Sequence, residues 1–169
     1  GLANAMRRLA QHQSERQRAK GREEVAPGFH VGRQKTDEHE ALRVAVRRFV
    51  ETRIPPAVAR AALDADTEKL PEFWDALAEP GWLGLHVDEA YGGAGYGLVE
   101  QAVVIEELGR AGAPGPYVPT AIAAAVLQEA KGAAADQWLA RLVRGEAIGA
   151  AALSGAEPVL GGALAEVIV

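Results

Sequence analysis

The sequence predicts a mainly α-helical domain that is followed by the beginning of a β domain. Through residues 37–144, apolar side chains recur at helical spacing in segments that proline and glycine separate. Residues 147–153 and 163–169 are short apolar runs, which are typical of strands. The order of these patterns therefore favours several helices first and a sheet afterwards.

The 169 residues divide into three expected parts. Residues 1–35 are polar and rich in arginine, which indicates a solvated extension or linker. Residues 36–145 form the helical domain, and residues 146–169 begin a β domain that is incomplete. Because the chain begins with Gly1 and ends in a strand-like apolar run, we expect a fragment of a longer protein.

Composition excludes several classes of function. The formal charge is −5 and the basic residues do not alternate with aromatic ones, so nucleic acid is not an expected partner. The absence of cysteine excludes disulfides, thiolate metal sites and thiol nucleophiles. No apolar run approaches the roughly 20 residues that cross a bilayer, so we expect no membrane span and a cytoplasmic location.

The first helix of the domain is predicted to begin at Asp37, because Asp37 and Glu40 form a capping-box pattern ahead of an apolar face. That face comprises Leu42, Ala45, Val46, Phe49 and Val50. Two prolines after Ile54 interrupt the helix. A second short helix is predicted at residues 71–79, and the apolar residues at 82–87 are predicted to be extended.

A long helix is predicted after the glycine-rich segment at residues 92–97. Its expected buried residues are Leu98, Ala102, Ile105 and Leu108, with Gly109 on the same stripe and Val99 and Val103 beside it. Glu106 and Arg110 form an i,i+4 pair outside that stripe. Two further helices are predicted at residues 120–131 and 136–144.

The glycine-rich segment "GGAGYG" raises the question of a phosphate site. A dinucleotide fingerprint needs Gly-x-Gly-x-x-Gly, and neither glycine pair continues in that way. The Gly-Lys-Ser/Thr ending of a P-loop is missing. We therefore expect a tight turn, in which glycine supplies positive φ and lets two segments approach closely.

Other catalytic arrangements are also missing. The two serines, Ser14 and Ser154, do not lie in a nucleophile elbow. The four histidines are scattered without metal-ligand spacing, so no metal site is expected. His86, beside two acidic residues, is predicted to be a surface group of the loop. Glu106 and Glu107 are adjacent on a helix, where they point in different directions and form no carboxylate dyad.

Several separated motifs resemble the N-terminal half of acyl-CoA dehydrogenases. They are "GWLGLHVDEAYGGAGYGLVEQAVVIEELGRAGAPGP", the helix of small residues after it, and "WLARLVRGEAIGAAAL". The family shows a Pro-Glu-x-Tyr-Gly-Gly-x-Gly loop, a helix that ends Glu-Glu-Leu-Gly/Ala-Arg, and a strand after Gly-Glu-x-x-Gly. The resemblance spans about residues 37–153 in the same order, which makes it specific.

The resemblance implies a helical domain, a middle β domain and a C-terminal helical bundle, assembled as a homo- or hetero-oligomer. It implies FAD as cofactor, an acyl-CoA substrate oxidised to the 2,3-enoyl-CoA in fatty-acid metabolism, and a flavoprotein as electron acceptor. The helix at 120–131 matches the helix that lines the acyl-chain pocket, with Thr120, Ala123, Ala124 and Leu127 on the expected face. The catalytic carboxylate belongs to the C-terminal bundle, so this segment has no catalytic residue and is expected to be inactive alone.

The stretch that the family places beside the flavin departs from the pattern. In the family it reads Thr-Glu-Pro-x-Ala-Gly-Ser-Asp, whereas here Leu153 is followed by "SGAEPVLGG". The expected cofactor-binding residues are Leu153, Ser154 and Val159, with Val159 in place of a flavin-contacting threonine. The final "VLGGALAEVIV" resembles a later strand pair, without the strands that precede it.

Either the chain lacks residues that the complete β domain has, or that domain is reduced; we favour the first, because a sheet without its central strands has unpaired edges. Two functions therefore remain open. The first is part of a flavin-dependent acyl-CoA dehydrogenase. The second is a non-catalytic, dehydrogenase-like subunit that serves as a structural partner in a heteromeric complex.

Overall fold

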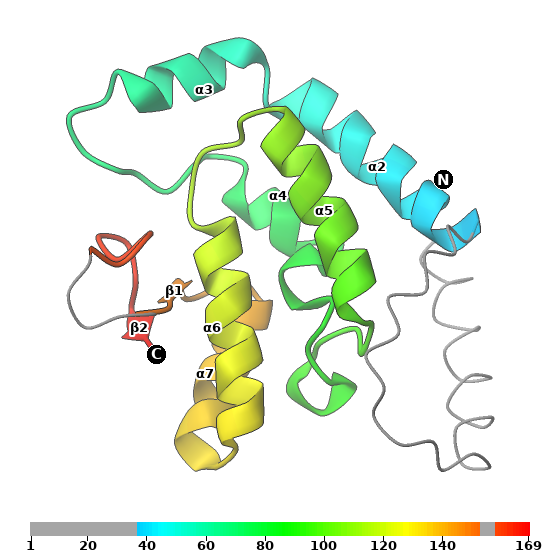
Figure 1. Ribbon diagram of the computed structural model, residues 1–169, viewed down its shortest axis with the longest axis vertical. Helices are drawn as coiled ribbons and strands as arrows, with labels where there is room; N and C mark the ends of the chain where they lie inside the picture. Colours follow the sequence, from blue (N-terminus) through cyan, green and yellow to red (C-terminus); the bar gives the residue numbers. More distant parts are fainter. Residues whose placement is uncertain (1–36, 153–157) are drawn as a thin grey trace.

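The structure, a computed structural model, describes residues 37–152 and 158–169. Its six α-helices in this part are α2 (Asp37–Arg53), α3 (Pro56–Leu63), α4 (Trp74–Ala78), α5 (Leu98–Arg110), α6 (Tyr117–Ala130) and α7 (Ala133–Val143). Two short 3₁₀ helices, η1 (Trp82–Gly84) and η2 (Glu89–Tyr91), lie between α4 and α5. Strands β1 (Gly149–Ala150) and β2 (Val167–Ile168) form one parallel pair (Figure 1).

The helices form two packed groups. In the first, α2 lies along α5, and α4, which contacts η1, lies near α5 (Figure 1). In the second, α6 packs against α7 and β1. The short connection between α5 and α6 joins the two groups, and it contains the proline and glycine residues that end α5.

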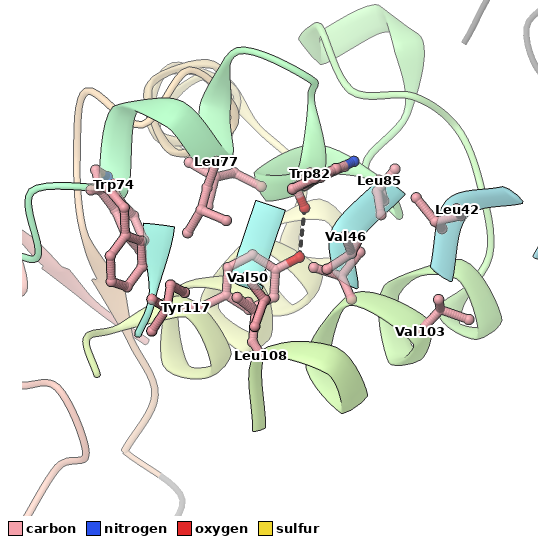
Figure 2. Packing of buried hydrophobic residues seen from close by; sticks show 14 of the residues in the cluster. Leu42, Val46, Val50, Trp74, Leu77, Trp82, Leu85, Val103, Leu108 and Tyr117 are labelled. Atoms are coloured by element: carbon pink, nitrogen blue, oxygen red, sulfur yellow. Dashed lines mark hydrogen bonds between the residues drawn. The ribbon is translucent and has the colours of Figure 1, made fainter. Parts of the chain in front are cut away.

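The core of the first group is built around large side chains. Figure 2 shows residues of α2, α4 and α5 converging on Tyr117 and Trp82. The Phe49 ring meets the Trp82 ring edge to face at 5.3 Å and the Phe73 ring at 6.3 Å. Such edge-to-face pairs add about 0.5 to 1.5 kcal/mol each beyond the area they bury.

The main helices lie where the sequence predicts them, with two differences. The helix α3 is additional: Pro56 occupies its first turn, where proline is favoured, although the sequence argument used the two prolines only as an interruption. Residues 82–87 are buried but are not extended, because η1 and turns replace the predicted extended segment. Gly81 precedes η1 with φ of 78°, a conformation that glycine adopts without strain.

The buried face of α5 differs from the predicted stripe. Leu108 is buried, but Leu98 is 68% exposed, Ala102 is exposed and Ile105 is only half-buried. The residues that α5 does bury are Gln101, Val103, Val104, Glu107 and Leu108. The predicted stripe left out the two polar residues of this set, which are buried because Gln101 bonds to Tyr117 and Glu107 pairs with Arg43 and Arg47.

The β region is shorter than predicted. Residues 160–164 form turns, so the stretch expected to hold a later strand pair contains a single strand, β2. That strand pairs directly with β1, with Val167 opposite Gly149 and Ile168 opposite Ala150. Gly161 has φ of 69°, which interrupts an extended backbone before β2. The division into domains at residue 145 stays a prediction.

Candidate functional site

The glycine loop between η2 and α5 uses its backbone N–H groups internally. From Tyr91 to Gly97, each of the seven N–H groups donates a hydrogen bond within the chain. The closest are Tyr96 N–H to the Leu85 carbonyl at 2.7 Å and Gly95 N–H to the Val87 carbonyl at 2.8 Å. A phosphate cradle needs such groups free, so this loop has no donors to offer a phosphate.

Close approach explains the glycines themselves. A Cβ atom on Gly93 would lie 2.1 Å from the Val87 carbonyl oxygen, so a side chain there would force the loop away from residues 84–87. Gly92 and Gly95 have φ of 84° and 63°. The predicted interpretation of the loop as a tight turn is confirmed, and the turn fixes the start of α5 against η1.

The four residues expected at the acyl-chain pocket share one buried face of α6. Thr120, Ala123 and Ala124 are at most 1% exposed, and Leu127 is 9% exposed. The alanines and Leu127 pack with Val87, α7 and the residues that precede β1. The structure therefore brings the predicted residues together at the junction of α6, α7 and β1, and their contact with an acyl chain stays a prediction.

The expected flavin site is only partly covered by the described residues. Leu153 and Ser154 lie outside them, and Val159 is half-buried. The side chain of Val159 offers neither a donor nor an acceptor to a flavin. The described residues do not by themselves fit an FAD site, and we derive no chemical step through the cofactor.

A buried polar network connects η1, α5 and α6. The Tyr117 hydroxyl donates to the Trp82 carbonyl at 2.7 Å, as Figure 2 shows, and accepts from Gln101 Nε2 at 2.9 Å. Gln101 Oε1 lies 3.1 Å from His86 Nδ1. Because a carbonyl only accepts, these bonds make Nδ1 of His86 the protonated nitrogen. Burial raises the pKa of Tyr117, which keeps its hydroxyl protonated as this network requires.

His86 is thus not the surface group that the sequence predicted, since it is 8% exposed. Its Nε2 atom is buried and has no hydrogen-bond partner among the described residues. One feature of the sequence could have indicated that His86 is buried. Gln101 is an amide between Val99 and Val103 on an apolar helix, and a buried amide needs a hydrogen-bond partner.

A second feature that sequence reasoning missed is the charge cluster between α2 and α5. The Glu107 side chain is 1% exposed and accepts from Arg43 at 3.0 Å and from Arg47 at 2.8 and 3.0 Å. Hydrogen bonds from Arg47 and Arg43 lower the pKa of Glu107, although burial opposes them. Glu106, in contrast, is 53% exposed, as the predicted divergence of the two carboxylates requires.

An open groove of about 1100 Å³ lies between α3 and the segment that leads to α4. A smaller groove of about 410 Å³ runs over Phe49 and Trp82 between α2 and α4. Neither groove includes the predicted pocket residues of α6.

In the described part of the chain, no group of three or more His, Asp or Glu side chains could hold a metal ion, and no helix has the length and apolar character to span a membrane.

The sequence matches a known protein family over the helical part of the structure. The family described as acyl-CoA dehydrogenase, N-terminal domain, matches residues 36–146. This chain belongs to the acyl-CoA dehydrogenase family. The matched residues include the glycine loop, the charge cluster and α6 of this chain.

Two curated relatives show how much of such a protein the chain spans. Acyl-CoA dehydrogenase IpdE2 of Mycobacterium tuberculosis is 38% identical over 135 residues, which are 79% of this chain and 42% of the relative. Mitochondrial isovaleryl-CoA dehydrogenase of Pongo abelii is 32% identical over 123 residues, 70% of this chain and 29% of the relative. The chain therefore spans less than half the length of these acyl-CoA dehydrogenases.

Solved structures agree with this assignment. A variant of the steroid ACAD Tcur3481-Tcur3483 superimposes with a TM-score of 0.64 at 31% identity, over 73% of this chain and 34% of that one. The ChsE4-ChsE5 complex of Mycobacterium tuberculosis gives a TM-score of 0.61 at 26% identity, over 74% and 35%. Both comparisons cover about a third of the chain in the solved structure.

Proposed function

We propose that this chain forms the N-terminal helical domain of a flavin-dependent acyl-CoA dehydrogenase that oxidises an acyl-CoA thioester to the 2,3-enoyl-CoA. The family match over residues 36–146 is the observation that carries the proposal. The glycine loop supports it, because its internally bonded N–H groups build a turn of the domain and leave no nucleotide site there.

Within that enzyme, the role of α6 is to form one wall of the acyl-chain pocket. Ala123 and Ala124 are the small residues that leave room beside the helix, and Leu127 supplies an apolar contact. FAD would supply the redox chemistry of the complete enzyme when bound. The carboxylate that removes the substrate proton lies in a part of the protein outside this chain, and a second flavoprotein accepts the electrons.

A specific observation favours the second candidate function, a non-catalytic subunit of a heteromeric dehydrogenase. The resemblance places Val159 where the family has a threonine that contacts the flavin, and valine offers no hydrogen bond there. Two of the structural relatives carry paired names, Tcur3481-Tcur3483 and ChsE4-ChsE5, and the latter is described as a complex. A chain with a weakened flavin site would serve such an assembly by completing its structure.

The test is to purify the protein as its gene encodes it, record the flavin absorbance band, and measure acyl-CoA-dependent reduction of an artificial electron acceptor. Yellow protein with turnover supports the catalytic function. Colourless protein that turns over acyl-CoA only together with a second dehydrogenase subunit supports the structural one. Protein that neither binds acyl-CoA nor forms a flavin-containing complex contradicts both.

A further inference from the structure

Strand β1 is bonded on both of its edges, and only one of those edges faces β2. Toward β2, Ala150 accepts from Val169 N–H at 3.0 Å, and Ala152 N–H donates to Val169 at 2.7 Å. In a parallel ladder the backbone groups of alternate residues point to opposite edges. The N–H and C=O of Gly149 therefore point away from β2 and toward α6.

One side chain satisfies both of these groups. Thr120 Oγ1 accepts a hydrogen bond from Gly149 N–H at 3.3 Å and donates one to the Gly149 carbonyl at 3.2 Å. A hydroxyl has a single proton to donate, so the Thr120 hydroxyl has no donor left for a ligand. Thr120 is 1% exposed, so water does not replace it at Gly149.

The approach of β1 to α6 is also limited by size. A Cβ atom on Gly149 would lie 2.6 Å from Cβ of Ala123 and 3.3 Å from a methyl group of Leu142. Glycine at 149 therefore allows the strand to lie directly on the helix. At this distance the Thr120 hydroxyl, one helical turn before Ala123, reaches the backbone of β1. It occupies the edge at which a neighbouring strand would bond.

We propose that Thr120 is a positioning residue, which fixes β1 on α6 by pairing with both backbone groups of Gly149, and that it does not contact the acyl group. The proposal rests on the proposed function, because it assigns a different role to one of the four residues expected at the acyl-chain pocket. Thr120 sets the distance between the helix and the strand, and Ala123, Ala124 and Leu127 remain the candidates for contact with substrate.

The test uses two substitutions in the full-length protein, Thr120→Val and Thr120→Ser. Valine keeps the shape and removes the hydroxyl, whereas serine keeps the hydroxyl and removes the methyl group. Thr52→Val is the matched control, since the Thr52 hydroxyl bonds to the Arg48 carbonyl on the exposed side of α2. The first measurement is hydrogen exchange at the Gly149 amide.

We expect Thr120→Val to accelerate that exchange about tenfold or more, since the amide loses its partner, while the serine variant and the Thr52 control stay within about threefold of the unsubstituted protein. Unchanged exchange in Thr120→Val overturns the proposal. If the valine variant does not fold, the serine variant decides, because an acceleration of about tenfold in Thr120→Ser, which keeps the hydroxyl, means that the hydroxyl does not hold Gly149.

The second measurement is the ratio of kcat/KM between a short and a long acyl-CoA. A positioning role predicts the same ratio for Thr120→Ser and the unsubstituted protein. A changed ratio with unchanged Gly149 exchange means that Thr120 contacts the acyl chain, and it overturns the proposal. Lack of turnover in every variant contradicts the proposed function but not the role of Thr120. The hydrogen-exchange experiment decides that role without any measurement of turnover.

Discussion

The junction of α2 with α5 and the junction of α6 with β1 are held together by opposite means. Across the first, long charged side chains meet at Glu107, which binds Arg43 and Arg47. Across the second, Gly149 and Ala123 bring the backbones close enough for one hydroxyl to bridge them. Paired long side chains fix a helix pair over a distance, whereas small residues fix a helix and a strand by direct approach.

The largest effect is expected when the charged junction is broken at its centre. Glu107→Ala should lower the free energy of unfolding by about 2 to 4 kcal/mol, because it removes a buried carboxylate that accepts charge-assisted hydrogen bonds from Arg43 and Arg47, whose side chains partly reach solvent. Urea unfolding measures this change. Glu106→Ala is the control, since Glu106 lies 2.8 Å from the same Arg43 but is 53% exposed, and its loss should cost less than about 1 kcal/mol. Equal losses for both would show that burial of Glu107 does not strengthen the junction.

A buried amide links the two junctions, because Gln101 of α5 bonds to Tyr117 of α6. Gln101→Leu should lower the free energy of unfolding by about 1 to 3 kcal/mol, since it leaves His86 Nδ1 without its acceptor. Gln137→Leu on the exposed side of α7 is the control and should be nearly neutral. A neutral Gln101→Leu would mean that water or a shifted His86 replaces the bond.

The small-residue junction is tested by adding volume. Ala124→Phe should shift the preference toward shorter acyl-CoA substrates by about 1 to 3 kcal/mol of discrimination, because the ring fills space beside α6. The measurement is kcat/KM against acyl-chain length, in which a loss of stability affects all substrates alike. Ala125→Phe, at the half-buried neighbouring position, is the control. An unchanged profile for Ala124→Phe contradicts the assignment of this face to the pocket.

The smallest effect is the pH dependence of the charged junction. The pKa of Glu107 in the folded protein is held below its ordinary value of 4.5. A lowered pKa stabilises the folded state above the ordinary value, and this stabilisation is lost as the pH falls through the folded pKa. The difference in unfolding free energy between the unsubstituted protein and Glu107→Gln should therefore shrink below about pH 4 and stay constant from pH 7 to 9. A difference that is constant into the acid range would contradict the pairing.

Sequence reasoning worked where local chemistry decides the conformation. Asp37 marks the first described residue of α2, proline and glycine separate α5 from α6, and the glycine loop is the predicted turn. Sequence reasoning failed for α5. The predicted apolar stripe through Leu98 and Ala102 is exposed there, and a face containing Glu107 is buried. Hydropathy places a carboxylate outside, unless the partner that neutralises it is known.

The sequence alone determined the helical segments, the tight turn at the glycines and membership of the acyl-CoA dehydrogenase family, because these depend on neighbouring residues and on the order of motifs along the chain. Only the tertiary structure decided which face of α5 is buried, that His86 lies inside, and that Thr120 pairs with Gly149. Each of these depends on a partner 15 or more positions away in the chain. Such pairs form when helices pack, since the free energy of a polar side chain is set by the groups that surround it after burial.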